Sequence, residues 1–189
     1  MGTLTDYLLT RRSSLSLSLH EPGPNAQQLE KLITIASRVP DHGKLAPWRF
    51  VLWTKEARAT MHADLLNLLE NYAEVDDKPK KIKGTDKLLH APCVLAVIST
   101  ASDHPKIPVR EQVLSAGAAC MNCIIASNAL GFEAQWLTAW YVYDDQARDI
   151  LDLKPGEEIA GIIHIGTSST PKTERTRPDL DEIYSVRER

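Results

Sequence analysis

The 189-residue sequence lacks long hydrophobic runs, an excess of positive charge and an even number of cysteines. Its apolar runs, such as Val94 to Ile98, have the length of a strand and are too short to cross a bilayer. The formal net charge of -3 disfavours nucleic acid or an anionic membrane as the main partner. Three cysteines without an N-terminal signal pattern fit a reducing compartment. We therefore expect a soluble, cytoplasmic protein with a single domain over residues 1–189.

Several chemical motifs are also missing. No Gly-x-Gly-x-x-Gly occurs, and the pair Gly161 and Gly166 is followed by Thr167, where a phosphate loop requires lysine. Cys120 and Cys123 fall inside an expected helix and not at its N-terminus, so we interpret both as core residues. No histidine pair has metal-ligand spacing, no serine lies in a nucleophile elbow, and no residue is an obvious general acid. Any phosphate bound by this protein would therefore be held by side chains.

The apolar periodicity predicts helices that alternate with strands. The expected helices span residues 4–10, 25–38, 55–74, 109–130 and 144–153. The expected strands span residues 50–54, 94–100, 134–138 and 159–166. We interpret the charged segment 75–84 as a solvated loop or lid, and the tail 167–189 as polar and irregular. The pattern predicts an α+β fold, with a small mixed sheet and helices on both faces.

Arg11, Arg12 and Ser13 follow the first expected helix and place two guanidinium groups beside a hydroxyl. This combination suits a phosphate, although arginine is also common at helix C-termini, where it interacts favourably with the dipole. Arg175 and Arg177, two positions apart in the tail, would point to the same side of an extended segment. They either add a second guanidinium pair to one phosphate or belong to a solvated tail.

Arg38, His42 and Lys44 place further donors on the segment after the second expected helix. Pro40 and Pro47 stiffen this segment, which leads into the next strand and can hold the donors against a ligand. An isolated loop histidine more often bonds to the backbone, so His42 is compatible with both interpretations.

Trp136, Leu137 and Thr138 end the third expected strand. The tryptophan is explained by core packing, or the strand end lays backbone N–H groups along a flat cofactor. Taken with the two groups of cationic residues, the second interpretation indicates a phosphorylated, electron-accepting ring system as the ligand.

These motifs resemble the FMN-dependent nitroreductase family. The resemblance rests on an opening helix followed by Arg-Arg-Ser, a second helix ending in Arg-x-Pro-Asp-His-x-x-x-x-Pro-Trp, and a closing Gly-Thr with a basic tail. It covers residues 4–166 and is strongest to the small single-domain NAD(P)H nitroreductase branch. It implies an α+β intertwined homodimer with FMN at the subunit interface, where each site is lined by both chains.

The resemblance also implies which residues contact FMN. The expected set is Arg11, Arg12, Ser13, Arg38, His42, Trp136, Leu137, Thr138, Arg175 and Arg177. Larger family members carry a Pro-x-Glu-Gly segment beside the flavin, where this chain has Gln135 to Thr138. A backbone N–H of Leu137 or Thr138 would then be the donor to flavin N5.

The activity implied by the resemblance is hydride transfer from NAD(P)H through FMN to a nitroaromatic, quinone or similar acceptor, in a ping-pong cycle. The cofactor supplies the chemistry, and we expect no catalytic side chain and no metal. One alternative is a flavin-binding or flavin-processing protein without nitroreductase turnover. A second alternative is a structural or interaction dimer without cofactor.

Overall fold

The computed structural model describes residues 3–188, in which four strands form one sheet in the order β1-β2-β4-β3. The strands are β1 (Trp48–Trp53), β2 (Cys93–Ser99), β3 (Glu133–Leu137) and β4 (Glu158–Gly166). Every pair is antiparallel, so the prediction of a mixed sheet is wrong for this part of the chain. Two helices join β1 to β2, and this hairpin returns the chain to the end of the sheet that it left, which reverses the strand direction.

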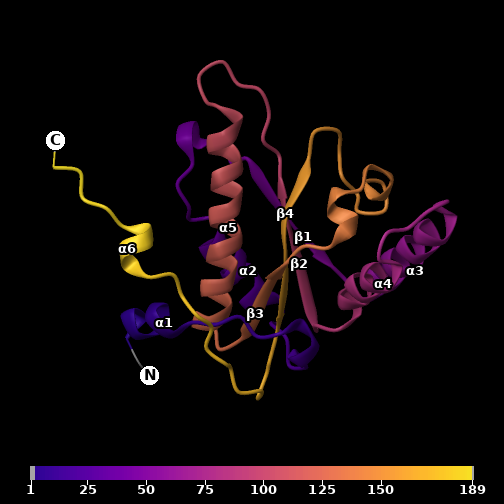
Figure 1. Ribbon diagram of the computed structural model, residues 1–189, viewed down its shortest axis with the longest axis horizontal. Helices are drawn as coiled ribbons and strands as arrows, with labels where there is room; N and C mark the ends of the chain where they lie inside the picture. The colour runs from indigo at the N-terminus through magenta and orange to yellow at the C-terminus, as the bar shows by residue number, and fades with distance from the viewer. Residues whose placement is uncertain (1–2, 189) are drawn as a thin grey trace.

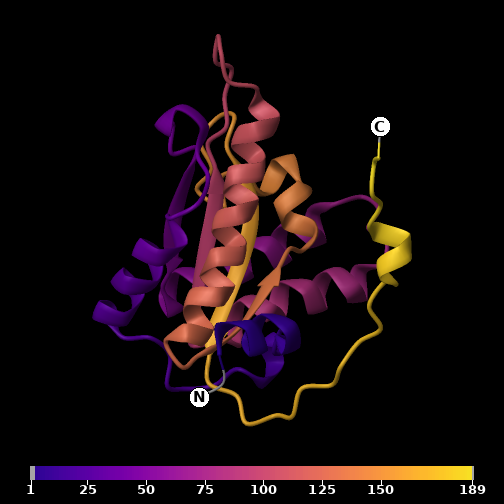
Figure 2. The same ribbon diagram turned by 90° about the vertical axis from the view of Figure 1, so that its left-hand side faces the viewer.

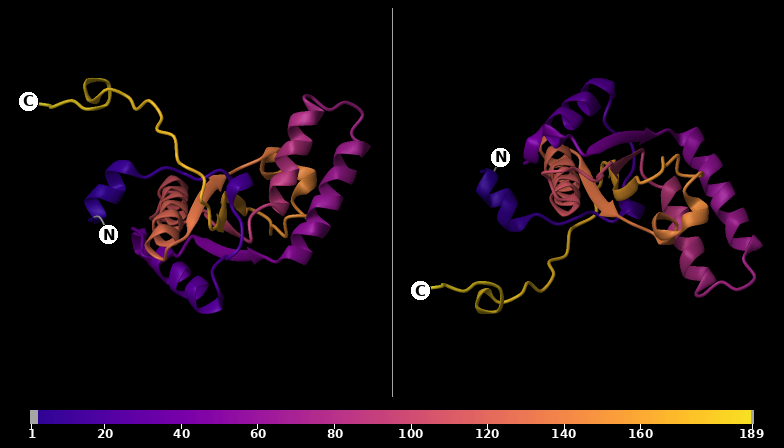
Figure 3. Two further views of the ribbon diagram at one scale, coloured as in Figure 1. Left: turned by 90° about the horizontal axis from the view of Figure 1, so that it is seen from below. Right: turned by 90° about the horizontal axis from the view of Figure 1, so that it is seen from above.

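Helices cover both faces of the sheet, as the sequence predicts. The α-helices of the described residues are α1 (Leu4–Thr10), α2 (Ala26–Ala36), α3 (Lys55–Asn71), α4 (Lys78–Asp86), α5 (Val109–Ala129) and α6 (Leu180–Ile183). Helices α2 and α5 pack on one face, and α3 and α4 lie over the other (Figures 1 and 3). Figure 2 shows α5 running along the sheet. Strand β2 is buried along its whole length because both of its faces are covered.

The structure confirms the expected starts of α1 and α2 to within one residue, and the expected end of α5 near Gly131. Thr3 and Asp6 form a capping box at the start of α1, and Asn25 and Gln28 form another at the start of α2. Gly131, which directly follows the last residues of α5, has a φ of 85° and takes the left-handed conformation that glycine tolerates best. No helix within residues 3–188 combines the length and apolar character needed to span a bilayer.

The core also holds the cysteines. Cys120 and Cys123 are fully buried between α5 and the sheet, together with Leu32 of α2 and Ile163 of β4. Burial raises the pKa of the Cys120 thiol to about 12. Both cysteines therefore act as small core residues, as predicted from their position inside a helix.

The prediction of a solvated loop or lid over residues 75–84 is wrong, because most of this segment belongs to helix α4. Asp77 starts the helix with its carboxylate accepting the N–H of Lys80, and Pro79 occupies the first turn, where proline is tolerated. The indole N–H of Trp140 contacts the carbonyl of Lys81 at 3.1 Å and the hydroxyl of Thr85 at 3.0 Å. These contacts with a distant tryptophan stabilise a helix that the charged local sequence does not predict.

The prediction of a helix over residues 144–153 is also wrong. This segment forms a short 3-10 turn at Asp145–Ala147, followed by further turns. The carboxylate of Asp144 accepts the N–H of Gln146 and the hydroxyl of Tyr72, the latter at 2.8 Å. Asp152 has a φ of 54°, a left-handed conformation that no α-helix includes. The side-chain contacts of Asp144 thus replace helical hydrogen bonding at the start of the segment.

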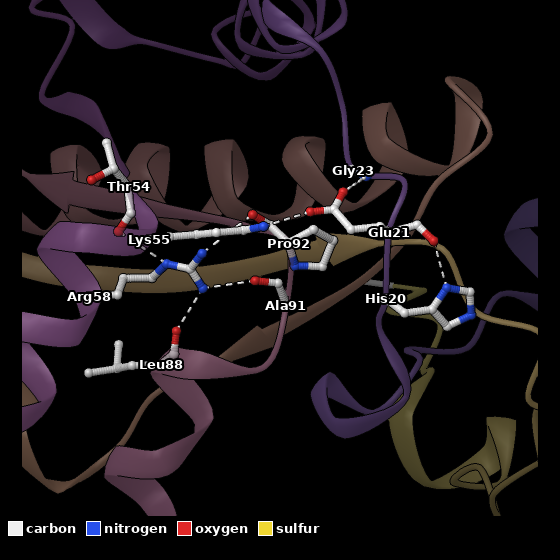
Figure 4. Close-up of polar contacts among 9 residues, drawn as sticks. All are labelled: His20, Glu21, Gly23, Thr54, Lys55, Arg58, Leu88, Ala91 and Pro92. Atoms are coloured by element: carbon white, nitrogen blue, oxygen red, sulfur yellow. Dashed lines mark hydrogen bonds and ion pairs between the residues drawn. The ribbon is translucent and has the colours of Figure 1, made fainter.

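Arg58 fixes the position of the chain as it enters β2 (Figure 4). Its side chain is buried, with 2% of the residue exposed. Its Nη1 donates to the carbonyl oxygens of Leu88 and Ala91 at 2.7 and 2.8 Å. Burial lowers the pKa of the guanidinium group from its ordinary value. The residue therefore joins α3 to the segment between α4 and β2.

Candidate functional site

A pocket of about 360 Å³ lies where the edge strand β3 ends, beside α5 and the segment after α1. Its lining residues are Arg11, Ser13, Met121, Ile124, Trp136, Leu137 and Thr138. Five of these belong to the ten predicted site residues. The pocket thus brings together one arginine and a hydroxyl from the N-terminal segment with the strand end that lies more than a hundred residues later.

Hydrogen bonds hold the N-terminal segment against the outer edge of β3. The N–H of Ser14 donates to the carbonyl of Ala134 at 3.3 Å, so this carbonyl points away from β4. In an antiparallel edge strand the direction alternates, which puts the N–H of Trp136 on the same outer edge and that of Leu137 toward β4. Thr138, the next residue in the alternation, follows the end of the strand. The free edge beside the pocket therefore offers the N–H of Trp136 and not that of Leu137.

Trp136 lies on the α5 face of the sheet, with 38% of the residue exposed. Its partner across the strands is Ile163, which packs in the core under α5. The indole lies directly over Gly161, where a Cβ would collide with its ring atoms. Gly161 is thus explained by close packing against an aromatic wall of the pocket, which supports the prediction that it belongs to no phosphate loop.

Arg11 carries an unpaired donor. Its Nε is shielded from solvent and has no hydrogen-bond partner among residues 3–188. Leaving a buried donor unpaired costs about 1–3 kcal/mol. Arg11 also lines the pocket, where its guanidinium group supplies positive charge.

Arg12 faces a smaller cavity of about 140 Å³ next to the pocket, which it shares with Ser13 and Lys172. Its Nε donates to the carbonyl of Thr173 at 3.0 Å. Lys172, which the sequence analysis did not select, forms an ion pair with Glu133 of β3 at 2.6 Å. The start of the tail is thereby tied to the same end of β3 as the N-terminal segment.

Arg175 and Arg177 follow in the exposed tail. The Nη2 of Arg177 lies 3.3 Å from the carboxylate of Glu174 and 3.5 Å from the carbonyl of Arg11. Arg175 is exposed, and its backbone N–H donates to the same carboxylate at 2.8 Å. The structure therefore brings Arg177 next to the Arg11 backbone and places Arg175 outside the pocket lining.

Arg38 and His42 lie elsewhere. The Nδ1 of His42 contacts Glu111 at 2.7 Å, at the start of α5. Glu111 precedes the pocket residue Met121 by ten positions, which is about 15 Å along a helix. Arg38 is exposed at the end of α2, where its carbonyl accepts the side-chain N–H of Asn122 at 3.0 Å. Within one chain, His42 therefore lies apart from the pocket, and Arg38 is not among the pocket's lining residues although its carbonyl contacts α5 next to Met121.

The loop that carries His42 is held in a strained shape. Gly43, Lys44 and Ala46 all have positive φ values, of 72°, 57° and 46°. For Lys44 and Ala46 this left-handed backbone costs about 1–2 kcal/mol each. The carboxylate of Asp41 compensates in part by accepting the N–H of Ala46 at 2.8 Å. Such over-determined strain clusters at functional sites, so the loop is a candidate second part of the site.

Comparison with known proteins gives the family. Residues 9–167 match the Nitroreductase family. The chain belongs to the nitroreductase family. This membership identifies it as an oxidoreductase.

Individual relatives of this nitroreductase-family chain agree with that result. A Haemophilus influenzae protein provisionally named an NAD(P)H nitroreductase is 33% identical over 174 residues, which cover 88% of this chain and 89% of the relative. A nitroreductase-like family protein from Bacillus cereus superposes with a TM-score of 0.82 at 22% identity, over 100% of this chain and 97% of that chain. An FMN-dependent nitroreductase from Clostridium difficile superposes with a TM-score of 0.69 at 19% identity, over 97% and 99%.

The family match also separates the candidate residues. Arg11, Arg12, Ser13, Arg38, His42, Trp136, Leu137 and Thr138 lie inside the matched range, whereas Arg175 and Arg177 lie beyond its end. Sequence reasoning missed Met121 and Ile124, which a spacing of three residues places on one face of α5. That spacing is a usable signal, but inside an apolar helix it does not distinguish a pocket wall from the core.

Proposed function

We propose that this protein uses FMN to transfer a hydride from NAD(P)H to nitroaromatic, quinone or similar acceptors, in a ping-pong cycle. The name of the Haemophilus influenzae relative supports the donor, and the FMN-dependent Clostridium difficile protein, which has the same fold, supports the cofactor. The observation that carries the proposal is the pocket that joins Arg11 and Ser13 to the end of β3.

The residues present fit FMN. Its phosphate needs several donors, and Arg11, Arg12 and Ser13 supply two guanidinium groups and a hydroxyl at adjoining cavities. Arg175 and Arg177 would add charge from the tail. The flat ring needs apolar walls, which Trp136 and the α5 residues Met121 and Ile124 provide. In this assignment the cation-rich segment after α1 holds the phosphate end and the strand end runs beside the ring.

Bound FMN would supply reversible two-electron chemistry, while the chain supplies position and electrostatics. The outward N–H of the β3 edge, from Trp136 or the following Thr138, would donate to the ring at N5. NAD(P)H and the electron acceptor would occupy the same open face of the flavin ring in turn, as a ping-pong cycle requires. Because the described pocket lining holds no carboxylic acid and no histidine, water would supply the protons.

We also propose an intertwined homodimer, because the described chain leaves the second part of the site and two apolar surfaces without a partner. Val113 and Leu114 of α5 are exposed, as are Leu180 and Ile183 of α6, at the end of a tail that extends away from the sheet (Figure 1). A second copy covering these surfaces would bring its own strained loop 41–46 to the pocket. Donor groups of that loop, Lys44 and the His42 imidazole among them, would then favour negative charge at the carbonyl edge of the ring.

The visible spectrum of the purified protein tests the proposed function. We expect a yellow protein, or uptake of added FMN, and anaerobic bleaching by NADH or NADPH. The double variant Arg11→Ala/Ser13→Ala should lose the flavin while it keeps its fold by circular dichroism. A colourless protein that takes up no FMN contradicts the proposal. A bound flavin that neither nucleotide bleaches favours the alternative, a flavin-binding or flavin-processing protein without nitroreductase turnover.

A further inference from the structure

A second cavity of about 360 Å³ lies beside the pocket, between α4 and the chain that leaves β3. Its lining residues are Asp76, Asp77, Lys80, Lys81, Lys83, Gly84, Lys87, Thr138, Ala139 and Trp140. Thr138 lines both cavities, so the two are direct neighbours. Whatever occupies the open face of the first pocket can therefore extend along α4.

The lysines are ordered along one helix face. Three residues follow Lys80 at distances of three, four and seven positions, namely Lys83, Gly84 and Lys87. This spacing places all four on a single face of a helix. Among residues 3–188 no carboxylate lies within 4.0 Å of the Nζ atoms of these three lysines, whereas Lys78 on the same helix pairs with Glu70 at 2.8 Å. The cavity thus faces unpaired positive charge.

Little negative charge offsets these lysines. Of the two carboxylates in the lining, that of Asp77 accepts the N–H of Lys80 as the helix cap. Asp76 is exposed, and Lys81 directs its Nζ to the ring of Trp140, 5.6 Å from the centroid. The lining therefore has an excess of positive charge, although the whole chain has a formal net charge of -3.

Gly84 lies on the same helix face as the lysines and also lines the cavity. Its φ lies outside the left-handed range, and a Cβ there would meet Ala139 at 3.6 Å and Trp140 at 3.8 Å, which are ordinary contacts. Neither backbone conformation nor protein packing therefore requires glycine, which weakens a helix interior. Repulsion between lysines three and four residues apart weakens the helix further. Both costs fall on the face toward the cavity, whose excess of lysines over carboxylates suits an anionic ligand.

We propose that this lysine face of α4 binds the phosphate groups of the nicotinamide dinucleotide donor and favours NADPH over NADH. The inference rests on the proposed function, which puts the nicotinamide ring at the pocket that Thr138 lines. The pyrophosphate follows one ribose away from that ring, and NADPH carries one more phosphate. Lys87 caps the C-terminus of α4 and lies seven residues after Lys80, about 10 Å along a helix, which suffices for both phosphate groups.

The test replaces two exposed lysines that have no ion-pair partner among the described residues, as Lys80→Gln/Lys83→Gln, and uses Lys78→Gln as the matched control. Steady-state kinetics with an uncharged quinone should show KM for NADPH rising by about tenfold and that for NADH by at most about threefold, with kcat unchanged. High salt should reduce this difference, because it screens exposed charges. The Lys78→Gln control should match the unmodified protein with both donors.

Direct binding gives a readout independent of turnover. Calorimetric titration with NADP⁺ and NAD⁺, on protein with and without FMN, should show tighter binding of NADP⁺ that the double variant loses. Equal NADP⁺ affinity in the double variant and the control overturns the inference, as does an effect confined to a negatively charged acceptor. Reduction of the bound flavin by either nucleotide would show that the proposed function survives such a result. If neither nucleotide reduces the flavin, the proposed function fails and the inference fails with it.

Discussion

Three arginines of this chain differ in what their guanidinium groups contact. Arg49 donates to both oxygens of the Glu157 carboxylate, at 2.8 and 2.6 Å. Arg58 donates to backbone carbonyls, and the Nε of Arg11 has no acceptor among residues 3–188. Removing one partner of a hydrogen-bonded pair such as Arg49 and Glu157 leaves the other group uncompensated, so these arginines hold parts of the chain together. The Arg11 Nε makes no such contact within the described residues. The residue type alone does not separate these roles, since all three are arginines close to a boundary of a predicted element.

We expect Arg58→Met to destabilise the protein by about 2–3 kcal/mol, because the buried carbonyl oxygens of Leu88 and Ala91 would lose their donor. Urea unfolding followed by circular dichroism measures the change. Lys55→Met is the control: Lys55 pairs with Glu21 at 2.9 Å on the surface, and its replacement should cost under about 1 kcal/mol. Equal losses in the two variants would show that Arg58 is no more than a surface charge.

Glu157 should make stability depend on pH. Hydrogen bonds from Arg49 are the main cause that lowers the pKa of Glu157 to about 2 from its ordinary value of 4.5. A carboxyl with a lowered pKa in the folded state contributes stability above pH 4.5, and this contribution is lost as the pH falls toward 2. Glu157→Gln should therefore be less stable at pH 7 and show a flatter decline below pH 5.

Unfolding free energies measured from pH 7 to pH 2.5 test this expectation. The matched control is Glu158→Gln at the exposed neighbouring position, which should retain the slope of the unmodified protein. If Glu157→Gln keeps the same slope, the ion pair with Arg49 is not the source of the acid sensitivity.

At the level of elements, the sequence predicts structure wherever local signals and packing agree. A possible threonine cap predicted α1, a capping box with an apolar stripe predicted α2, and the glycine that follows predicted the end of α5. The fully apolar β2 was predicted as a buried strand. Helix α4 was missed because its stability comes from contacts with Trp140, far along the chain. Residues 144–153 were predicted as a helix because apolar spacing does not reveal the side-chain bonds of Asp144. Long-range contacts decided both errors.

The next prediction concerns Gly161 in strand β4 of the sheet. A methyl group at this position would collide with the indole of Trp136 and push it toward the pocket opening. Overpacking of this kind costs about 1–3 kcal/mol, so we expect Gly161→Ala to weaken FMN binding by about tenfold or more. Flavin fluorescence titration measures the affinity, and tryptophan fluorescence reports the displaced indole.

A double-mutant cycle provides the control for Gly161. In a Trp136→Leu background the methyl group has no indole to displace, so Gly161→Ala should cause little further loss of FMN affinity. Equal effects of Gly161→Ala in both backgrounds would mean that the glycine acts on the sheet itself and not through Trp136.

At the scale of the whole molecule, the sequence selected two groups of candidate residues that one chain keeps apart. Arg11 and Thr138 line the pocket at the end of β3, whereas His42 contacts Glu111 in the first turn of α5. Apolar periodicity and motif spacing say nothing of which residues meet across a subunit boundary. The prediction that two chains line each site came from the resemblance to the family. If one chain supplies the pocket and its partner supplies the His42 loop, the two groups must lie apart within each chain.

A site shared by two chains predicts complementation between two inactive variants. Arg11→Ala damages the part of the site that a chain gives to its own pocket, and His42→Ala damages the part that it gives to its partner. Each variant alone should bind little FMN. When the two are unfolded together and refolded, half of the dimers are mixed, and each mixed dimer has one intact and one doubly damaged site. Flavin content and NAD(P)H oxidation should therefore recover to about one site in four. Size-exclusion chromatography checks that the variants remain dimers, and the absence of any recovery in mixed dimers would place both residues in a site built by one chain.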